Sequence, residues 1–96
     1  MKFIEKDFKT FKIIDLLDPE PIGSVEIIEE IGYNFIENIF LEKMYRNQGY
    51  LRKIIDYLKT NKPLVCLPLP EHLNKFKHLG FQEYERTGED VYYILR

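Results

Sequence analysis

Apolar residues along this chain follow two different periods, and each period predicts one kind of element. In the first 41 residues they alternate loosely with polar residues, which is typical of strands. Pro19 and Pro21 interrupt the alternation, because proline does not sit inside a central strand. Gly32 marks a hairpin turn. The predicted strands are residues 3–8, 11–17, 22–30 and 33–41.

A helical period begins after Gly49. Leu51, Ile54, Ile55 and Leu58 have the i, i+3, i+4, i+7 spacing of one buried stripe, which predicts a helix over residues 49–60. A continuous apolar run then predicts a buried strand at 64–69, and a shorter helix is predicted at 71–79 with Gly80 as its C-cap. Residues 81–86 and 90–96 read as a closing hairpin.

These elements give the order β-β-β-β-α-β-α-β-β. The predicted fold class is α/β (α+β), with a mixed, mostly antiparallel sheet and two main helices in one domain over residues 1–96. No helical period appears before Gly49, so no helix is expected between the first strands.

Composition indicates the class of protein and the compartment in which it works. The chain is 45% hydrophobic and 31% charged, which is typical of a globular domain. Its one cysteine, Cys66, excludes an internal disulfide and fits a reducing compartment. The charged first nine residues are unlike a signal peptide, and no apolar run is long enough to span a membrane. We therefore expect a cytoplasmic protein with no membrane partner.

Charge changes sign along the chain although the net charge is only −2. Residues 18–42 contain seven carboxylates and no Lys or Arg, whereas residues 43–62 contain six basic residues against Asp56 alone. This pattern fits two ordinary solvated faces. The alternative is a polyanion held at the basic end and a cation drawn to the acidic side.

The loop between the fourth strand and the first helix is the strongest candidate for a binding site. Gly49 lets successive backbone N–H groups turn toward one point, and the free N–H groups of the first helical turn point the same way. With the positive end of the helix dipole behind it, such a concavity suits a phosphate.

Two segments resemble motifs of the GNAT superfamily of N-acyltransferases. Arg46, Gly49 and Leu51 are similar to its Arg-x-x-Gly-x-(Gly/Ala) loop, with leucine in place of the small residue. The segment from Phe76 to Phe81 is similar to its Tyr-x-x-Leu-Gly-Phe segment. The resemblance implies a minimal member of this fold that lacks the usual N-terminal helices, with acetyl-CoA (CoA) as cofactor.

The resemblance also implies where CoA would bind. The pyrophosphate would lie on backbone N–H groups of the loop and beside Arg46, and the pantetheine arm would pair with the preceding strand. The implied cofactor-binding residues are Ile39, Phe40, Leu41, Arg46, Asn47, Gln48, Gly49, Tyr50 and Leu51.

Acyl transfer to an amine needs a base, because a protonated amine has no lone pair and a lysine-type amine is charged at neutral pH. Glu37 is the candidate, as the only carboxylate in the strand 33–41, where alternation places it between Phe35 and Ile39 on one face and removes water from it. Two alternatives are a bulge that rotates Glu37 to solvent and an ion pair across the sheet.

The proton donor for the departing thiolate is less clear. The resemblance implies a tyrosine at position 76 and an asparagine at position 69, but the chain has Phe76 and Leu69, and neither can donate a proton. The remaining candidates are Tyr45, Tyr57, Cys66 and His78.

Three functional hypotheses follow. The first is a small N-acetyltransferase that moves acetyl from acetyl-CoA to a primary amine by direct attack. The alternative is a catalytically weak or inactive GNAT-fold module that binds CoA or a partner, and the third is a purely structural partner protein. The acceptor would be a small-molecule or peptide amine, and the protein a monomer or homodimer.

Two further ligand classes are disfavoured. His72 and His78 do not share a helix face, so we expect no metal site. The acidic strands argue against nucleic acid.

Overall fold

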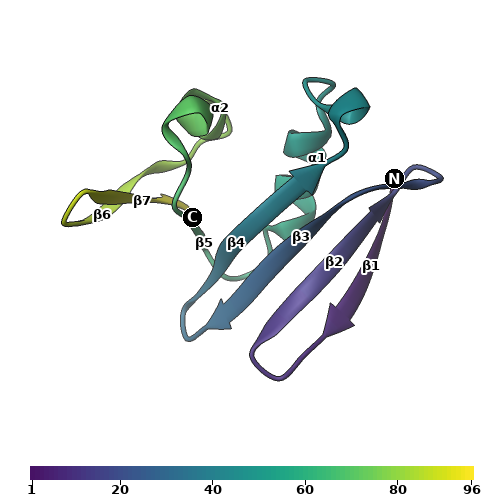
Figure 1. The fold of residues 1–96 in the computed structure, drawn as a ribbon. Helices are drawn as coiled ribbons and strands as arrows, with labels where there is room; N and C mark the ends of the chain where they lie inside the picture. Colours follow the sequence, from purple (N-terminus) through teal and green to yellow (C-terminus); the bar gives the residue numbers. More distant parts are fainter.

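The computed structural model describes all residues from 1 to 96 and contains one seven-stranded sheet with two α-helices (Figure 1). The elements in chain order are β1 (Lys2–Asp7), β2 (Phe11–Leu17), β3 (Pro21–Glu30), β4 (Tyr33–Leu41), the 3₁₀ turn η1 (Lys43–Tyr45), α1 (Tyr50–Leu58), β5 (Leu64–Cys66), the 3₁₀ turn η2 (Pro70–His72), α2 (Leu73–His78), β6 (Gln82–Thr87) and β7 (Asp90–Leu95). The predicted order of strands and helices is confirmed.

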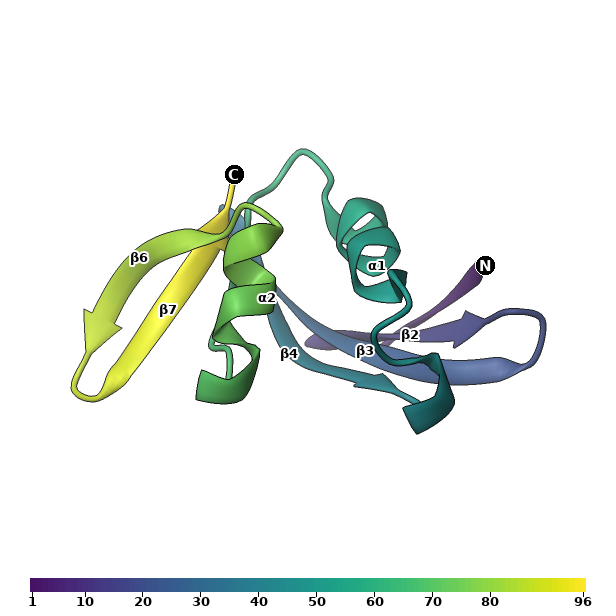
Figure 2. The same ribbon diagram turned by 90° about the horizontal axis from the view of Figure 1, so that it is seen from above.

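The strands lie in the order β1-β2-β3-β4-β5-β7-β6. Strands β1 to β4 form an antiparallel meander, β4 and β5 are parallel across the α1 connection, and β5, β7 and β6 are antiparallel. The β6–β7 hairpin curls away from the meander (Figure 2). The predicted mixed, mostly antiparallel sheet is therefore confirmed.

Most predicted boundaries agree with the structure to within two residues, but β5 is shorter than expected. It ends at Cys66, not at residue 69, and Leu67 and Leu69 are exposed. Pro68 and Pro70 have no N–H to donate to a neighbouring strand, so the chain leaves the sheet there and enters η2.

The apolar stripe of α1 covers the sheet. Ile54, Ile55 and Leu58 are buried and Leu51 is half-buried, as the spacing predicted. Leu73, Phe76 and Leu79 of the α2 segment pack against the same core. The core cluster consists of Ile14, Leu16, Ile22, Val25, Ile27, Ile36, Ile54, Ile55, Leu58, Leu64, Cys66, Phe81 and Tyr93.

A β-bulge interrupts the β3–β4 pairing at Glu37. Asn38 pairs with Glu26 and Ile36 with Ile27, so Glu37 has no partner. The bulge changes which residues of β4 face the core: Ile36 before it and Ile39 after it. Our expectation that Phe35, Glu37 and Ile39 share one face is wrong, because the extra residue shifts the alternation by one position.

The edge strand β1 is tied to α1 by side chains. The Phe3 and Tyr57 rings stack with their centroids 3.8 Å apart. The Tyr57 hydroxyl donates to Glu5, and Lys12 Nζ lies 2.9 Å from the same carboxylate. The hydrogen bond from Tyr57 and then that from Lys12 lower the pKa of Glu5, while the same contacts with Glu5 raise the pKa values of Tyr57 and Lys12.

Residues 8–10 join β1 directly to β2, and no α-helix precedes α1. No helix in the structure combines the length and the apolar character needed to cross a bilayer.

Gly23 offers a test of the close approach of β3 to β4. A Cβ at that position would overlap the backbone carbonyl oxygen of Phe40 on β4. Because two paired strands cannot easily move apart, we expect Gly23→Ala to destabilise the fold by about 1–3 kcal/mol. Ser24→Ala, at the next position, is the control and should change stability by less than about 0.5 kcal/mol. Urea unfolding measures both; equal midpoints would contradict the close approach of β3 and β4.

Candidate functional site

A cleft opens where β4 and β5 separate. The two strands pair only from Asn34–Leu64 to Ile36–Cys66. Beyond that point β4 continues to Leu41 along β3, whereas the chain after Cys66 turns away toward η2. A cavity of about 600 Å³ lies in the gap. It is lined by residues 36–41, 45–47, 49–51 and 66–69 and by His72, Lys75 and Phe76.

The loop at the end of the cleft presents unpaired amides. Asn47 and Gly49 have positive φ angles of 61° and 83°, which turns the backbone sharply before α1. None of the N–H groups from Asn47 to Leu51 donates to a protein acceptor, and no side chain caps the helix. A Cβ on Gly49 would meet no atom within 4 Å, so no other part of the chain packs against this side of Gly49. This arrangement can receive an anion.

Arg46 lies beside this loop and lines the cleft. Its Nε donates to the backbone oxygen of Leu41 at 2.9 Å, and its guanidinium carbon lies 6.0 Å from the centre of the Phe40 ring. The two terminal guanidinium nitrogens make no protein hydrogen bond. Gln48, in contrast, does not line the cleft, because its side chain turns back to donate to the oxygen of Met44 at 2.6 Å.

Tyr50 and Leu51 anchor the start of α1. The Tyr50 hydroxyl donates to Asp18 at 2.5 Å, and this hydrogen bond raises the pKa of Tyr50. The half-buried Leu51 packs against the core and also lines the cleft. The leucine that replaces a small residue in the loop motif therefore belongs to the hydrophobic stripe of the helix.

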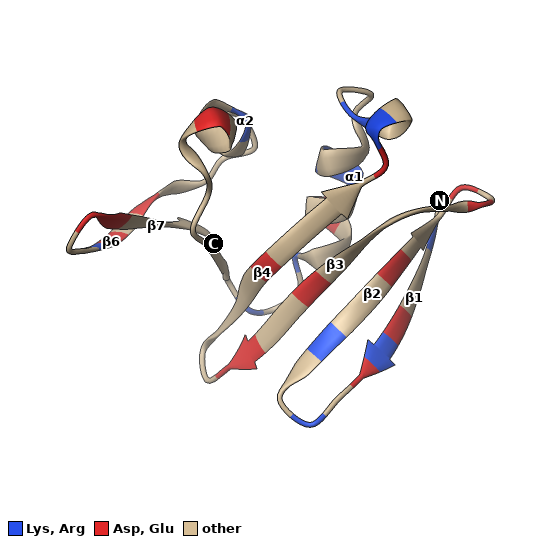
Figure 3. Cartoon of the chain, viewed as in Figure 1, with Lys and Arg blue, Asp and Glu red and all other residues tan.

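Basic side chains gather at this end of the cleft. Blue segments mark η1 and the loop before α1, and a red segment lies between β4 and η1 (Figure 3). The first turn of α1 contains no acidic residue. A negative ligand at the loop would therefore meet the helix dipole and nearby basic side chains, with no carboxylate in the first turn of α1 itself.

Glu37 lies on the bulge, lines the cleft and is exposed. It forms no ion pair or side-chain hydrogen bond. The expectation that Phe35 and Ile39 strip it of water is wrong, because the bulge turns it to solvent. Its carboxylate is therefore open to a group that enters the cleft.

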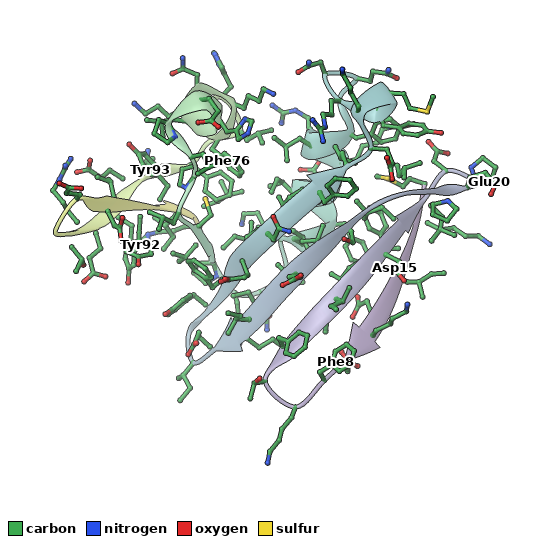
Figure 4. All side chains as sticks on the ribbon, viewed as in Figure 1. Phe8, Asp15, Glu20, Phe76, Tyr92 and Tyr93 are labelled. Carbon is green, nitrogen blue, oxygen red and sulfur yellow. The ribbon has the colours of Figure 1, made fainter.

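The wall of the cleft opposite β4 carries apolar side chains, and several potential proton donors were expected in the cleft. Phe76 points from α2 toward the strands and meets Phe81 edge-on, with the ring centroids 5.3 Å apart (Figure 4). Of the four candidate proton donors, Tyr45 and Cys66 line the cleft, whereas Tyr57 and His78 do not.

His72, which our sequence reasoning considered only as a metal ligand, also lines the cleft. Its position four residues before Phe76 could have revealed this, because residues four apart share a helix face. No group of three or more His, Cys, Asp and Glu side chains is arranged to hold a metal ion.

No protein-family model matches the sequence, and no curated protein matches it. Solved structures do match. An acetyltransferase assigned to the GNAT family, from Bacteroides thetaiotaomicron, covers 93% of this chain with a TM-score of 0.69 and 19% sequence identity. The chain has the GNAT fold.

Two other structures with the GNAT fold are similar to this chain. The Bacillus subtilis N-acetyltransferase YlbP, in complex with coenzyme A, has a TM-score of 0.73 at 15% identity and covers 90% of this chain and 66% of its own. The Campylobacter jejuni N-acetyltransferase PseH, in complex with acetyl coenzyme A, has a TM-score of 0.72 at 14% identity and covers 93% of this chain and 70% of its own. The present chain spans 62% of the Bacteroides protein.

The reactivity of the Cys66 thiol tests whether this side chain is buried. The thiol is buried in β5, and desolvation raises its pKa to about 12. At pH 8 its thiolate fraction should be about 10³-fold lower than that of an ordinary thiol. We expect a thiol reagent to label the native protein at least that much more slowly than the urea-unfolded protein. Similar rates in the two states would contradict the burial of Cys66.

Proposed function

We propose that this chain binds acetyl-CoA in the cleft between β4 and β5 and transfers the acetyl group to a primary amine. The observation that carries the proposal is the row of unpaired amides from Asn47 to Leu51, which ends a cleft that β4 and β5 leave open. The GNAT fold and the CoA complexes of similar structures support it. The acceptor is a small-molecule or peptide amine.

The loop holds the diphosphate of the donor. Backbone N–H groups donate hydrogen bonds to a phosphate whatever the side chains are, so leucine at position 51 does not remove these donors. Arg46 adds a positive charge beside the amides, and its terminal nitrogens are free to bind phosphate oxygens. Gln48 contributes through its backbone amide alone, because its side chain is bound to Met44.

Strand β4 holds the pantetheine arm. One edge of β4 is paired with β3, but its other edge has no strand partner beyond Ile36. Backbone groups of Ile39, Phe40 and Leu41 on that edge pair with the amides of the arm, as an added strand would. One of these N–H groups, directed at the acyl oxygen, polarises the thioester.

Glu37 removes the proton of the amine. Acetyl-CoA, when bound, supplies an activated acetyl thioester. The exposed carboxylate on the bulge lines the same cleft, and it accepts the proton directly or through a water molecule. The neutral amine then attacks the acetyl carbon directly.

One observation favours the second function, a GNAT-fold module that binds CoA without turning it over. Phe76 and Leu69 line the cleft where the resemblance implies a tyrosine and an asparagine, and neither side chain donates a proton. Release of free CoA thiol in the presence of a panel of amines separates the two functions.

Acetyl-CoA binding is the first test. Calorimetry should detect binding by the wild-type protein, and Arg46→Ala should weaken it about 10-fold to 100-fold, the value of a lost charge-assisted hydrogen bond. Arg52→Ala is the matched control: it removes the same charge from an exposed position of α1 that does not line the cleft. No binding at millimolar acetyl-CoA would reject the function, and equal losses would reject the role of Arg46.

Turnover tests the base. Glu37→Gln preserves shape but cannot accept a proton, so kcat should fall by about 10²-fold or more. The KM for acetyl-CoA should stay unchanged, because the phosphate loop is intact. Glu26→Gln, on β3 opposite Asn38 and outside the cleft lining, is the control. If both variants turn over at the wild-type rate, Glu37 is not the base.

A further inference from the structure

The proposed acetyl transfer releases a CoA thiolate, and a side chain of this cleft has to return a proton to its sulfur. Six titratable side chains besides His72 line the cavity: Glu37, Tyr45, Arg46, Tyr50, Cys66 and Lys75. A useful donor must be a stronger acid than a thiol, whose ordinary pKa is about 8.5, and it must be free to point at the sulfur.

Most of these groups do not meet both conditions. Cys66 is buried, and its pKa is raised to about 12. The Tyr50 hydroxyl is already donated to Asp18. Arginine stays protonated, and tyrosine and lysine are ordinarily weaker acids than a thiol.

A histidine side chain, in contrast, is ordinarily a stronger acid than a thiol and exchanges protons near neutral pH. His72 closes η2 and directly precedes α2, which places it four residues before Phe76. One helical turn advances about 5.4 Å, so the two side chains are neighbours on one face. Both line the cleft on the wall opposite β4. His72 is also exposed, so its imidazole can recover a proton from water after each cycle.

We propose that His72 is the general acid of this cleft and that it takes the place of the donor missing at Phe76. This inference rests on the proposed acetyl transfer. The amine nitrogen forms a bond to the acetyl carbon, and the carbon–sulfur bond breaks with its electron pair on sulfur. Glu37 accepts the proton that the charged amine loses before attack, water takes the second proton from the nitrogen as the amide forms, and the His72 imidazolium gives its proton to the thiolate. The products are an acetamide and the free CoA thiol.

The first test does not depend on turnover. The chain has only two histidines, and His78 does not line the cleft, so its imidazole resonances serve as an internal reference. In NMR titrations with CoA and with desulfo-CoA, the His72 signals should shift more with the ligand that carries sulfur. The His78 signals should not distinguish the two ligands. Equal responses of His72 to both ligands would place it away from the sulfur and overturn the proposal.

The second test is kinetic. His72→Gln should lower kcat by about 10²-fold while the KM for acetyl-CoA stays constant. His78→Gln, the matched control at the last residue of α2, should keep the wild-type kcat. An unchanged kcat in His72→Gln would reject the acid assignment.

The outcomes separate this inference from the function on which it rests. A wild-type protein that binds no acetyl-CoA rejects both. A wild-type protein that binds and acetylates, but with an indifferent His72, rejects only the present inference. If the wild-type protein binds CoA without turnover, the comparison of CoA with desulfo-CoA still decides whether His72 lies at the sulfur.

Discussion

The early separation of β4 from β5 is the constraint on which the candidate site depends. Parallel strands that remain paired use their backbone groups on each other, but these two pair over only three residues of each strand. Beyond Ile36 one edge of β4 has no strand partner in the middle of a seven-stranded sheet. Unpaired backbone groups in a protein interior require water or a ligand. The cleft and the loop before α1 lie along this edge, and the bulge lies in the pairing of β4 with β3.

The fold was largely predictable because its elements are amphipathic. The stripe from Leu51 to Leu58 matched the buried face of α1, and Gly32 correctly marked the hairpin between β3 and β4. The main error was the length of β5. Leu67 and Leu69 continue an apolar run, but the alternating prolines withdraw them from the sheet. Hydrophobicity alone could not distinguish a buried strand from residues that line a cleft.

The site was predictable only where local chemistry determines it. Glycine at position 49 and the first turn of a helix are local features, so the open amides could be inferred from sequence. The bulge at Glu37 was only an alternative at the level of sequence and not the favoured prediction, because it depends on the register with β3. One signal was present: Ile36 and Ile39 are both apolar but three residues apart, and strict alternation cannot place both in the core. His72 was missed as a cleft residue because it lies outside the segment from Phe76 to Phe81 that resembles the family motif.

The hydrogen bond between Tyr50 and Asp18 has a consequence for recognition. It joins the turn before β3 to the first residue of α1, two segments 32 positions apart in the chain. The amides of the loop are thus braced from a distant part of the sheet before any ligand arrives. Less conformational freedom remains to be lost when a ligand docks, so more of the contact energy appears as affinity. The Tyr50 hydroxyl thus holds the start of α1 in place in the absence of a ligand.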